Sequence, residues 1–366
     1  MKFTVPKKDI LFELQLLQGI VEKRNTMPIL ANILIHTTEK ELEMTGTDLE
    51  VGLKTHIPAK IEEQGTITIS GKKLFEIVKS LPENKEIVFQ EDKDLKMEIT
   101  SGESVFKVMC LPKEDYPQVP EPKFEKKIIL PLQRIQEMID CVYCAITQEQ
   151  RYYLNGALMI LNGNSIELIS TDGHRLAYTK SQVDDLKVEE EIKAIVSKKT
   201  LAEMRKLENE IMEFDFDDNN LFFKVQNRTL ISRIIEGKFP NYDAVIPKEN
   251  PNILTISREE IMDAIKRVSL LSTERSRGVK MEIDKNELRL FSSNPEMGEA
   301  RDKIEVDYQG EKLEIGFNSQ YILDFLATAE TEQVRLELKD ENSAILMKPE
   351  GSGETAYLYV LMPMKI

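Results

Sequence analysis

A strand–turn–strand unit lies near the middle of the chain and reads Ser170-Thr171-Asp172-Gly173-His174-Arg175-Leu176-Ala177. The residues before it, Ile166-Glu167-Leu168-Ile169, alternate in the manner of a strand. Asp172-Gly173 is a turn pair, because Asp tolerates the left-handed backbone region and Gly enters it without steric cost. The chain then resumes an extended segment at Arg175.

Two weaker copies of this unit occur elsewhere, from Leu42 to Glu50 and from Leu288 to Pro295. Aligning the three copies divides the chain into thirds that repeat about every 120 residues, far longer than a solenoid repeat of about 20–50. Each third is large enough for its own core. We therefore predict an α+β fold of three repeated domains, each with two helices on antiparallel sheet, over 1–120, 127–247 and 252–366.

Helix signals recur at matching places in the three thirds. The first helix of each third is predicted at 9–21, from Pro131 onward, and after the capping sequence Ser257-Arg258-Glu259-Glu260. The second helix is predicted at 70–81, with Ser70 as N-cap, at 197–207 and at 319–328. The predicted strands of the first two thirds lie at 29–36, 41–46, 51–57, 65–69, 86–90, 95–100, 105–109, 156–161, 165–170, 175–182, 211–216, 221–225 and 229–235; the chain ends on one at 356–361.

Composition indicates a globular protein, with 41% hydrophobic and 31% charged residues among 366. There is no apolar run long enough to span a membrane, and the start of the chain lacks the apolar core of a signal peptide, so we expect a cytoplasmic protein. Cys141 and Cys144 have C-x-x-C spacing without a second Cys or His pair. Two reduced helix cysteines are favoured over metal or redox chemistry, and no cofactor is expected.

The net charge of −15 argues against binding nucleic acid through the overall field, so any contact needs a local group of cations. The second helices supply such groups, because residues seven apart share a helix face: Lys72 with Lys79, Lys198 with Arg205, and Lys199 with Lys206. Further helix cations are Arg24, Arg134, Lys266 and Arg267. Such helices contact phosphates without reading bases, and binding would be weak and salt-sensitive. The helix at 319–328 departs from the pattern, since it carries Asp324 and no cation.

Repeated sheet domains leave open edges, and a ring made by two-fold pairing of two arcs removes them. Beside the turn at 171–175, apolar residues of the middle third and the C-terminus form half of a candidate pocket. The terminal Met362-Pro363-Met364 suits a site that accepts several partners, because Met is adaptable.

Besides a ring that contacts DNA, two interpretations of the chain's function stay open. A hydrolase with His174 as general base is suggested by Asp172-Gly173-His174, but the chain has no third partner, phosphate-binding loop or metalloprotease motif beside it. An adhesive scaffold without a role on DNA is the second alternative.

Four motifs together carry a resemblance over the whole chain. They are Ser170 to Ala177, Arg151 to Gly156, Phe239-Pro240-Asn241-Tyr242 and the ending Val360 to Met364. With these motifs the chain resembles the bacterial sliding clamps, the beta subunits of DNA polymerase III. The resemblance implies no catalysis, a head-to-tail homodimer and a six-domain ring around duplex DNA. It also implies a pocket for a short linear motif carried by the polymerase alpha subunit, the clamp loader, repair polymerases and other proteins.

The resemblance also implies site residues. The partner-peptide pocket would comprise Leu154, Thr171, Gly173, His174, Arg175, Leu176, Pro240, Val245, Tyr321, Val360, Met362, Pro363 and Met364. DNA contact would fall to Arg24, Lys73, Gln148, Tyr152, Tyr153 and Lys198, and the dimer seam would join Phe106 and Val108 to Leu270 and Leu271 of the other copy. Two departures from the family pattern are Ala244, where some relatives have Arg, and the ending Lys365-Ile366.

Overall fold

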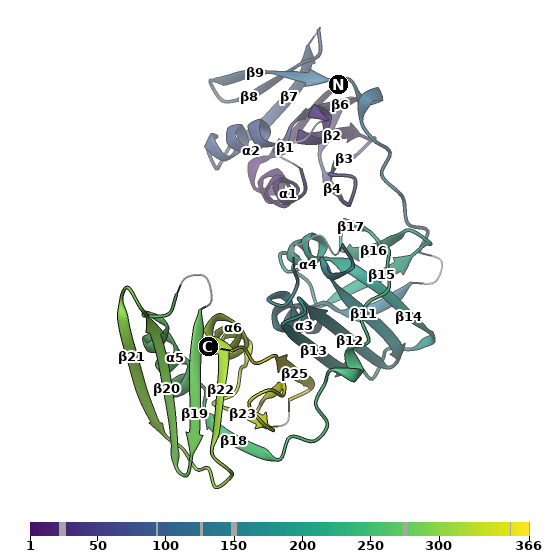
Figure 1. Cartoon of the computed structure of the whole chain (residues 1–366). Coiled ribbons are helices and arrows are strands. Elements are labelled where there is room, and N and C mark those ends of the chain that lie inside the picture. Colours follow the sequence, from purple (N-terminus) through teal and green to yellow (C-terminus); the bar gives the residue numbers. More distant parts are fainter. Residues whose placement is uncertain are drawn as a thin grey trace. The chain divides into compact units, whose positions relative to one another are not determined.

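The computed structural model describes residues 1–21, 27–92, 94–124, 127–147, 152–273, 277–351 and 353–365. The chain forms two compact units. Figure 1 labels their helices and strands. Unit 1 comprises Met1–Gln133 and Lys199–Ile234, and unit 2 comprises Arg134–Lys198 and Ile235–Ile366. Grouping by contact thus differs from the three sequence repeats, whose boundaries at 120, 127, 247 and 252 stay predictions.

One antiparallel sheet runs through unit 1. Its strands, in order of neighbours, are β10 (Ile128–Pro131), β15 (Ile211–Phe216), β16 (Asn220–Val225), β17 (Arg228–Arg233), β4 (Val51–Pro58), β3 (Glu41–Thr47), β2 (Asn32–Thr37), β6 (Thr66–Ser70), β9 (Ser104–Leu111), β8 (Lys96–Ser101), β7 (Glu86–Asp92), β1 (Lys2–Pro6) and β5 (Lys60–Glu63). At the join, β17 pairs with β4 and Leu230 lies opposite Leu53. The strands of the first third therefore continue into those of the middle third without a break.

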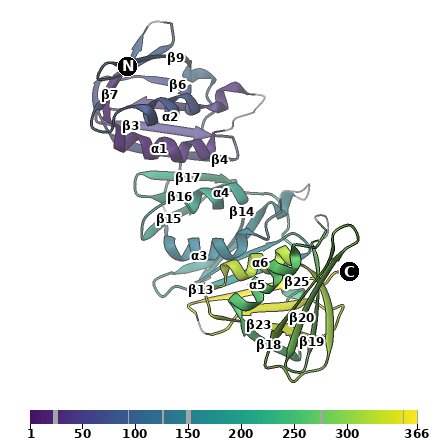
Figure 2. The same cartoon turned by 90° about the vertical axis from the view of Figure 1, so that its left-hand side faces the viewer.

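Helices α1 (Lys7–Ile20) and α2 (Gly71–Ser80) lie side by side against this sheet (Figure 2). The predicted face of α1 is confirmed, since Ile10, Leu14 and Leu17 are fully buried. The predicted cap of α2 is also confirmed, because Ser70 Oγ accepts the backbone N–H of Lys73. This bond satisfies one of the N–H groups that a helix start leaves without an internal partner.

Unit 2 contains two antiparallel sheets. The larger has the order β14 (Val188–Ser197), β11 (Gly156–Gly163), β12 (Ser165–Thr171), β13 (Arg175–Gln182), β25 (Thr355–Leu361), β24 (Ile345–Pro349), β23 (Gln333–Leu338) and β18 (Asn252–Ser257). The smaller has the order β21 (Gly298–Glu305), β20 (Glu287–Asn294), β19 (Gly278–Asp284) and β22 (Leu313–Asn318). In the larger sheet β13 pairs with β25, so the strand after the central turn lies beside the C-terminal strand.

Three helices complete this part of the structure: α3 (Leu132–Tyr143), α5 (Arg258–Ser269) and α6 (Ser319–Thr328). α5 packs against α6 and against β19–β21. The bounds of α6 coincide with the predicted range, and Ser257 Oγ caps α5 by accepting the N–H of Glu260, as predicted. α4 (Lys198–Met204) is shorter than its predicted range of 197–207.

The strand–turn repeat seen in the sequence is confirmed in atomic detail for the first two copies. In the turns at 47–51 and 171–175, the Thr hydroxyl at the first position donates to the carbonyl of the fifth residue and accepts the N–H of the third. The Asp carboxylate at the second position accepts the N–H groups of the fourth and fifth. The third position has positive φ in both, 78° at Leu49 and 89° at Gly173. Gly173 meets this requirement without strain, whereas Leu49 must be held there by its neighbours.

The third copy keeps one part of this arrangement. Ser292 Oγ donates to the carbonyl of Val268, the penultimate residue of α5, just as Ser170 Oγ donates to the carbonyl of Val142 on α3. In both copies the strand before the turn is thereby tied to the last turn of the first helix. Each serine adds a second bond to its carbonyl, because the N–H of Ala145 also donates to Val142 and that of Leu271 to Val268.

In the first two thirds, the sequence patterns missed β1, β5, β10 and β14 and placed several residues in the wrong element. In the last third, they identified only the strand–turn unit at 288–295 and the strand at 356–361. Pro131, predicted as the first helical residue, is the last residue of β10. β14 carries three consecutive glutamates, which hide the alternation that marks a strand. Residues 29–31, predicted as strand, belong instead to a 3-10 turn at Pro28–Ala31, because a proline pre-sets the helical φ at its start.

Candidate functional site

Polar groups of the turn at 171–175 hydrogen-bond to one another, and both carboxylate oxygens of Asp172 take part. One carboxylate oxygen accepts the N–H groups of His174 and Arg175, and the other accepts Nε of Arg175 at 3.0 Å. The imidazole of His174 is on an exposed residue. Asp172 is thus engaged with backbone and guanidinium, which is a structural use and not the orientation of a catalytic base.

Buried apolar residues of six strands meet beside this turn. The cluster consists of Leu158, Ile160, Ile169, Leu176, Ile195, Leu346 and Val360, and the partly buried residues packed on it are Tyr153, Tyr178, Ile235, Phe239, Tyr242, Ile246, Ala344 and Leu358. All lie in unit 2. The structure therefore brings residues of the middle third, the segment 235–246 and the C-terminal strand into one cluster, which includes Leu176 and Val360 from the predicted pocket.

The predicted pocket residues divide by exposure. Leu154, Thr171, Leu176 and Val360 are buried. Gly173, His174, Pro240, Val245 and Met362 are exposed, and Tyr321, Pro363 and Met364 are half-buried. The tail is fixed, because Met362 N–H donates to the carbonyl of His174 at 2.9 Å and Met364 N–H donates to that of Gly316 at 2.9 Å. Pro240 and Val245 adjoin Phe239 and Ile246, which pack on the cluster.

Sequence reasoning missed part of this region. Leu346 on β24 and Leu358 on β25 join the cluster, and Tyr178 stacks on Tyr242 with ring centroids 6.0 Å apart. The only sequence signal for Leu346 was a short apolar run. Its position became evident from the pairing of Leu346 with Val360 across β24 and β25.

Arg175 is 9% exposed and sits among groups from four elements. Besides Asp172, its Nη1 donates to Asp324 Oδ2 at 2.5 Å and to the hydroxyl of Tyr359 at 3.0 Å. Its Nη2 donates to the carbonyl of Cys144 at 2.5 Å, just past the end of α3. The ring of Tyr321 lies 4.2 Å from the guanidinium carbon.

The predicted DNA-contact residues differ in their surroundings. Lys73 on α2 is 64% exposed and pairs with Glu76 at 2.9 Å. Tyr152 is 76% exposed, whereas Tyr153 packs on the apolar cluster. Lys198 is half-buried and donates to the carbonyl of Ile146 at 2.8 Å, and its pKa is lowered by burial first and by the positive charge of Arg175 second. Arg24 and Gln148 lie outside the described residues.

Several other helix cations have carboxylate partners. Lys199 Nζ lies 2.5 Å from Asp48 Oδ2 and also donates to the carbonyl of Ile20, and Lys206 pairs with Glu203 at 2.7 Å. Arg134 pairs with Glu354, Lys266 with Asp263 and Arg267 with Asp302. The spacing of seven identified residues on one helix face, but it could not show which of them face another part of the chain.

The predicted seam residues are accessible in the single chain. Leu270, which follows α5, is 75% exposed, and Leu271, Phe106 and Val108 are half-buried. β21 is an edge strand, and β9 pairs with β6 only through Cys110 and Leu111. Both strands thus offer backbone groups to a further strand.

The three cysteines are reduced. Burial is the first cause that raises the pKa of Cys141 to about 12 and of Cys144 to about 11, so both thiols are protonated near neutral pH. Within the described ranges, no group of three or more His, Cys, Asp or Glu side chains could hold a metal ion. In the same part of the chain, no helix is long and apolar enough to cross a membrane.

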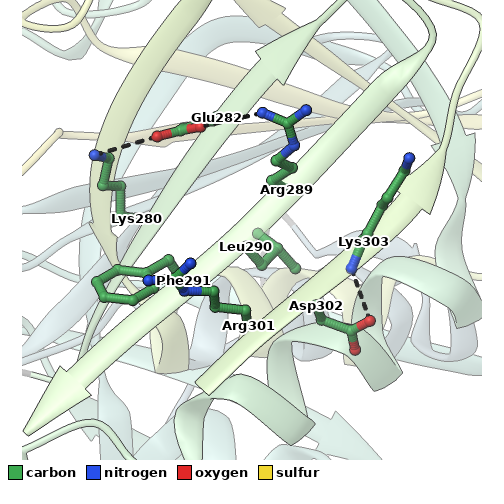
Figure 3. Close-up of a pocket in the computed structure, with 8 residues that line it drawn as sticks. All are labelled: Lys280, Glu282, Arg289, Leu290, Phe291, Arg301, Asp302 and Lys303. Atoms are coloured by element: carbon green, nitrogen blue, oxygen red, sulfur yellow. Dashed lines mark hydrogen bonds and ion pairs between the residues drawn. The ribbon is translucent and has the colours of Figure 1, made fainter. Parts of the chain in front are cut away.

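A cleft on the smaller sheet of unit 2 is lined by none of the predicted site residues (Figure 3). Its lining residues are Lys280, Glu282, Arg289, Leu290, Phe291, Arg301, Asp302 and Lys303. Lys280 and Arg289 share Glu282, at 3.3 and 3.9 Å, and the Arg301 guanidinium lies over the Phe291 ring at 5.3 Å. The lining has four cations and two carboxylates. Glu314, Glu287 and Glu299 beside it pair with these cations and neutralise most of the remaining charge.

Comparison with protein families identifies the chain. The N-terminal, central and C-terminal domain models of the DNA polymerase III beta subunit match residues 1–120, 129–241 and 243–365. The chain belongs to the DNA polymerase III beta subunit family. A subunit of this family is a non-catalytic accessory protein of the polymerase, which excludes the hydrolase interpretation of His174.

Relatives of the DNA polymerase III beta subunit family match along the whole chain. The beta sliding clamp of Pseudomonas putida is 35% identical, with all of both chains covered. The crystal structure of the DNA polymerase III subunit beta from Pseudomonas aeruginosa has a TM-score of 0.94 at 33% identity, with full coverage of both chains. A sliding clamp from Bartonella birtlesii, solved bound to griselimycin, has a TM-score of 0.95 at 32% identity, again with full coverage.

Proposed function

We propose that the chain is a DNA sliding clamp, a processivity factor that encircles duplex DNA and tethers the replicative polymerase and other partners. The observation that carries this proposal is the match of all three clamp domains in succession along the chain. The repeated strand–turn units support it, because they mark three copies of one architecture.

The proposed ring is a head-to-tail homodimer. Each chain contributes three domains, 1–120, 127–247 and 252–366, which gives six in the ring. Phe106 and Val108 of one copy would meet Leu270 and Leu271 of the other. The exposed side chain of Leu270, the open edge of β21 and the largely unpaired side of β9 support this assignment, because exposed apolar side chains and unpaired strand backbone favour association.

The proposed partner site is the surface around the turn at 171–175, where exposed Gly173, His174, Pro240, Val245 and Met362 surround the buried floor of Leu154, Thr171, Leu176 and Val360. Tyr321, Pro363 and Met364 would complete it, together with Arg175. Its occupants would be linear motifs of the polymerase alpha subunit, the clamp loader and repair polymerases. An apolar floor with an adaptable Met rim suits short apolar motifs of differing sequence.

The proposed DNA contacts are to phosphates and independent of sequence, made by Arg24, Lys73, Gln148, Tyr152, Tyr153 and Lys198. Within α2, Lys72 and Lys73 are 63% and 64% exposed and share the single carboxylate of Glu76. This helix therefore keeps a net positive surface in an acidic chain, which supports a local phosphate contact.

Replacing Lys72 and Lys73 together by Glu should weaken binding to a duplex oligonucleotide and flatten its salt dependence. The slope of log K against log salt should fall by about 2, because each phosphate contact contributes about 0.9. Fluorescence anisotropy over a salt series measures this slope.

The control is Lys40→Glu with Lys60→Glu, which changes the net charge equally at two exposed positions outside α2. An equal loss in both variants would contradict a specific role for α2 and would support a general field effect.

A further inference from the structure

Arg175 donates four of the five N–H groups that a guanidinium carries, all to its own chain. The acceptors are the turn carboxylate of Asp172, Asp324 on α6, Tyr359 on β25 and the carbonyl of Cys144 after α3. Tyr359 links Arg175 to the backbone of α6, because its hydroxyl also donates to the carbonyl of Tyr321 at 2.9 Å. A buried guanidinium used in this way has little left with which to bind a ligand.

The same arrangement recurs in unit 1, where the source of the cation differs. Lys199 Nζ bridges the turn carboxylate of Asp48 and the carbonyl of Ile20, the last residue of α1. Arg175 bridges the turn carboxylate of Asp172 and the carbonyl of Cys144. A cation at the carbonyl end of a helix is stabilised by the helix dipole and by the orphan carbonyls there.

The recurrence bears on function because only one of the two turns adjoins the proposed pocket. If the bridge existed to bind a peptide, the turn at 47–51 would have no reason to carry it. A cation that links the turn to the preceding helix is thus a feature of the repeated architecture. At Arg175 the bridge has been extended to α6 and β25, two elements that carry pocket residues.

We infer that Arg175 is a positioning residue of the proposed pocket, which holds the turn, the end of α3, α6 and β25 in the arrangement that a partner peptide meets, and that it does not bind the peptide. This inference rests on the proposed function of the site. Asp172, which Arg175 holds, accepts the backbone N–H groups of His174 and Arg175 and so orders the turn. The contacts of Arg175 to the Tyr359 hydroxyl and the Tyr321 ring set one wall of the pocket. The shape of the pocket would therefore depend on Asp324 as well. One of its carboxylate oxygens accepts from Arg175 and the other accepts from Gln320.

The test is a double-mutant cycle with griselimycin as the probe, measured by isothermal titration calorimetry on the full chain. Arg175→Met and Asp324→Asn should each weaken binding by about tenfold, which is about 1.4 kcal/mol. The double variant should bind no more weakly than the worse single variant, because the two residues act through one network. Arg175→Lys, which keeps the charge but not the forked geometry, should be intermediate.

Lys199→Met is the matched control, since it breaks the equivalent bridge in unit 1. It should lower the stability of unit 1 and leave griselimycin affinity unchanged. Urea unfolding curves of each variant identify conditions under which all variants are folded. Griselimycin affinity is then measured under those conditions.

Two results would overturn the inference while leaving the pocket in place. Asp324→Asn could bind as the unaltered chain does while Arg175→Met is weakened, which would make Arg175 a direct ligand contact. Alternatively, all variants could lose stability with no change in affinity, which would make the network purely structural. Griselimycin is the ligand with which the clamp of Bartonella birtlesii was solved. If the unaltered chain did not bind it, this pocket would not be its site and the inference would fail, whereas the family and the fold would stand.

Discussion

Leu270→Ala combined with Leu271→Asp should convert the proposed dimer into monomers. Leu270 is 75% exposed in the single chain, and Leu271 is half-buried. Truncating a Leu that becomes buried costs about 2 kcal/mol or more, and a carboxylate forced into an apolar joint costs several more. Since about 1.4 kcal/mol is a factor of ten, the dissociation constant should rise by at least about a thousandfold.

Sedimentation velocity at micromolar protein measures this change, since the unaltered chain should sediment as a species of twice the 42.1 kDa chain mass. Ile253→Asp is the matched control: it places the same charge on another exposed apolar residue of unit 2, 43% exposed on β18, and should leave the dimer intact. A Leu270→Ala/Leu271→Asp variant that remained dimeric would show that the seam lies elsewhere.

Glu13→Gln should destabilise unit 1 by about 3 kcal/mol or more, because it leaves a buried guanidinium without its counter-charge. Glu13 on α1 accepts Nε of Arg228 at 3.0 Å and Nη2 at 2.6 Å, and the hydroxyl of Thr55 at 2.7 Å. Both charged side chains are almost wholly buried, at 3% and 11% exposed. The pair joins the first third to β17 of the middle third, beside the β17–β4 pairing.

Urea unfolding followed by circular dichroism measures the free energy of unfolding, with the transition of unit 1 fitted separately from that of unit 2. Glu76→Gln, which removes a carboxylate of exposed ion pairs, should leave the transition unchanged. Adding Arg228→Met to Glu13→Gln should recover part of the loss, because no unpaired charge then remains buried. If Glu13→Gln behaved like Glu76→Gln, the buried pair would not hold the two thirds together.

The sequence could predict what depends on local pattern. Ser70 and Ser257 were identifiable as helix caps because a hydroxyl before an apolar periodic run is a local signal, and the bounds of α6 followed from the same kind of evidence. The correspondence of the turns at 47–51 and 171–175 was visible because Thr-Asp occupies the same places in both. Their matching hydrogen bonds show that the two turns repeat in structure as well as in sequence.

What the sequence could not predict depends on contacts between distant segments. Arg175 meets Asp324, 149 residues away, and nothing local to either residue marks the pairing. Lys199 has the spacing of a surface cation, yet it faces Asp48, 151 residues away. β14 failed as a prediction for a local reason, since its glutamates break the alternation, and it was recovered only through its pairing with β11.

The most direct test of the clamp mechanism is retention on nicked circular DNA, before and after the circle is linearised, at moderate salt with a clamp loader and ATP. Topological linkage predicts that the unaltered chain stays on circles and is lost from linear ends, and that the Leu270→Ala/Leu271→Asp variant is retained on neither. Equal retention on circular and linear DNA would mean ordinary surface binding and would contradict the clamp mechanism, although the family and the fold would stand.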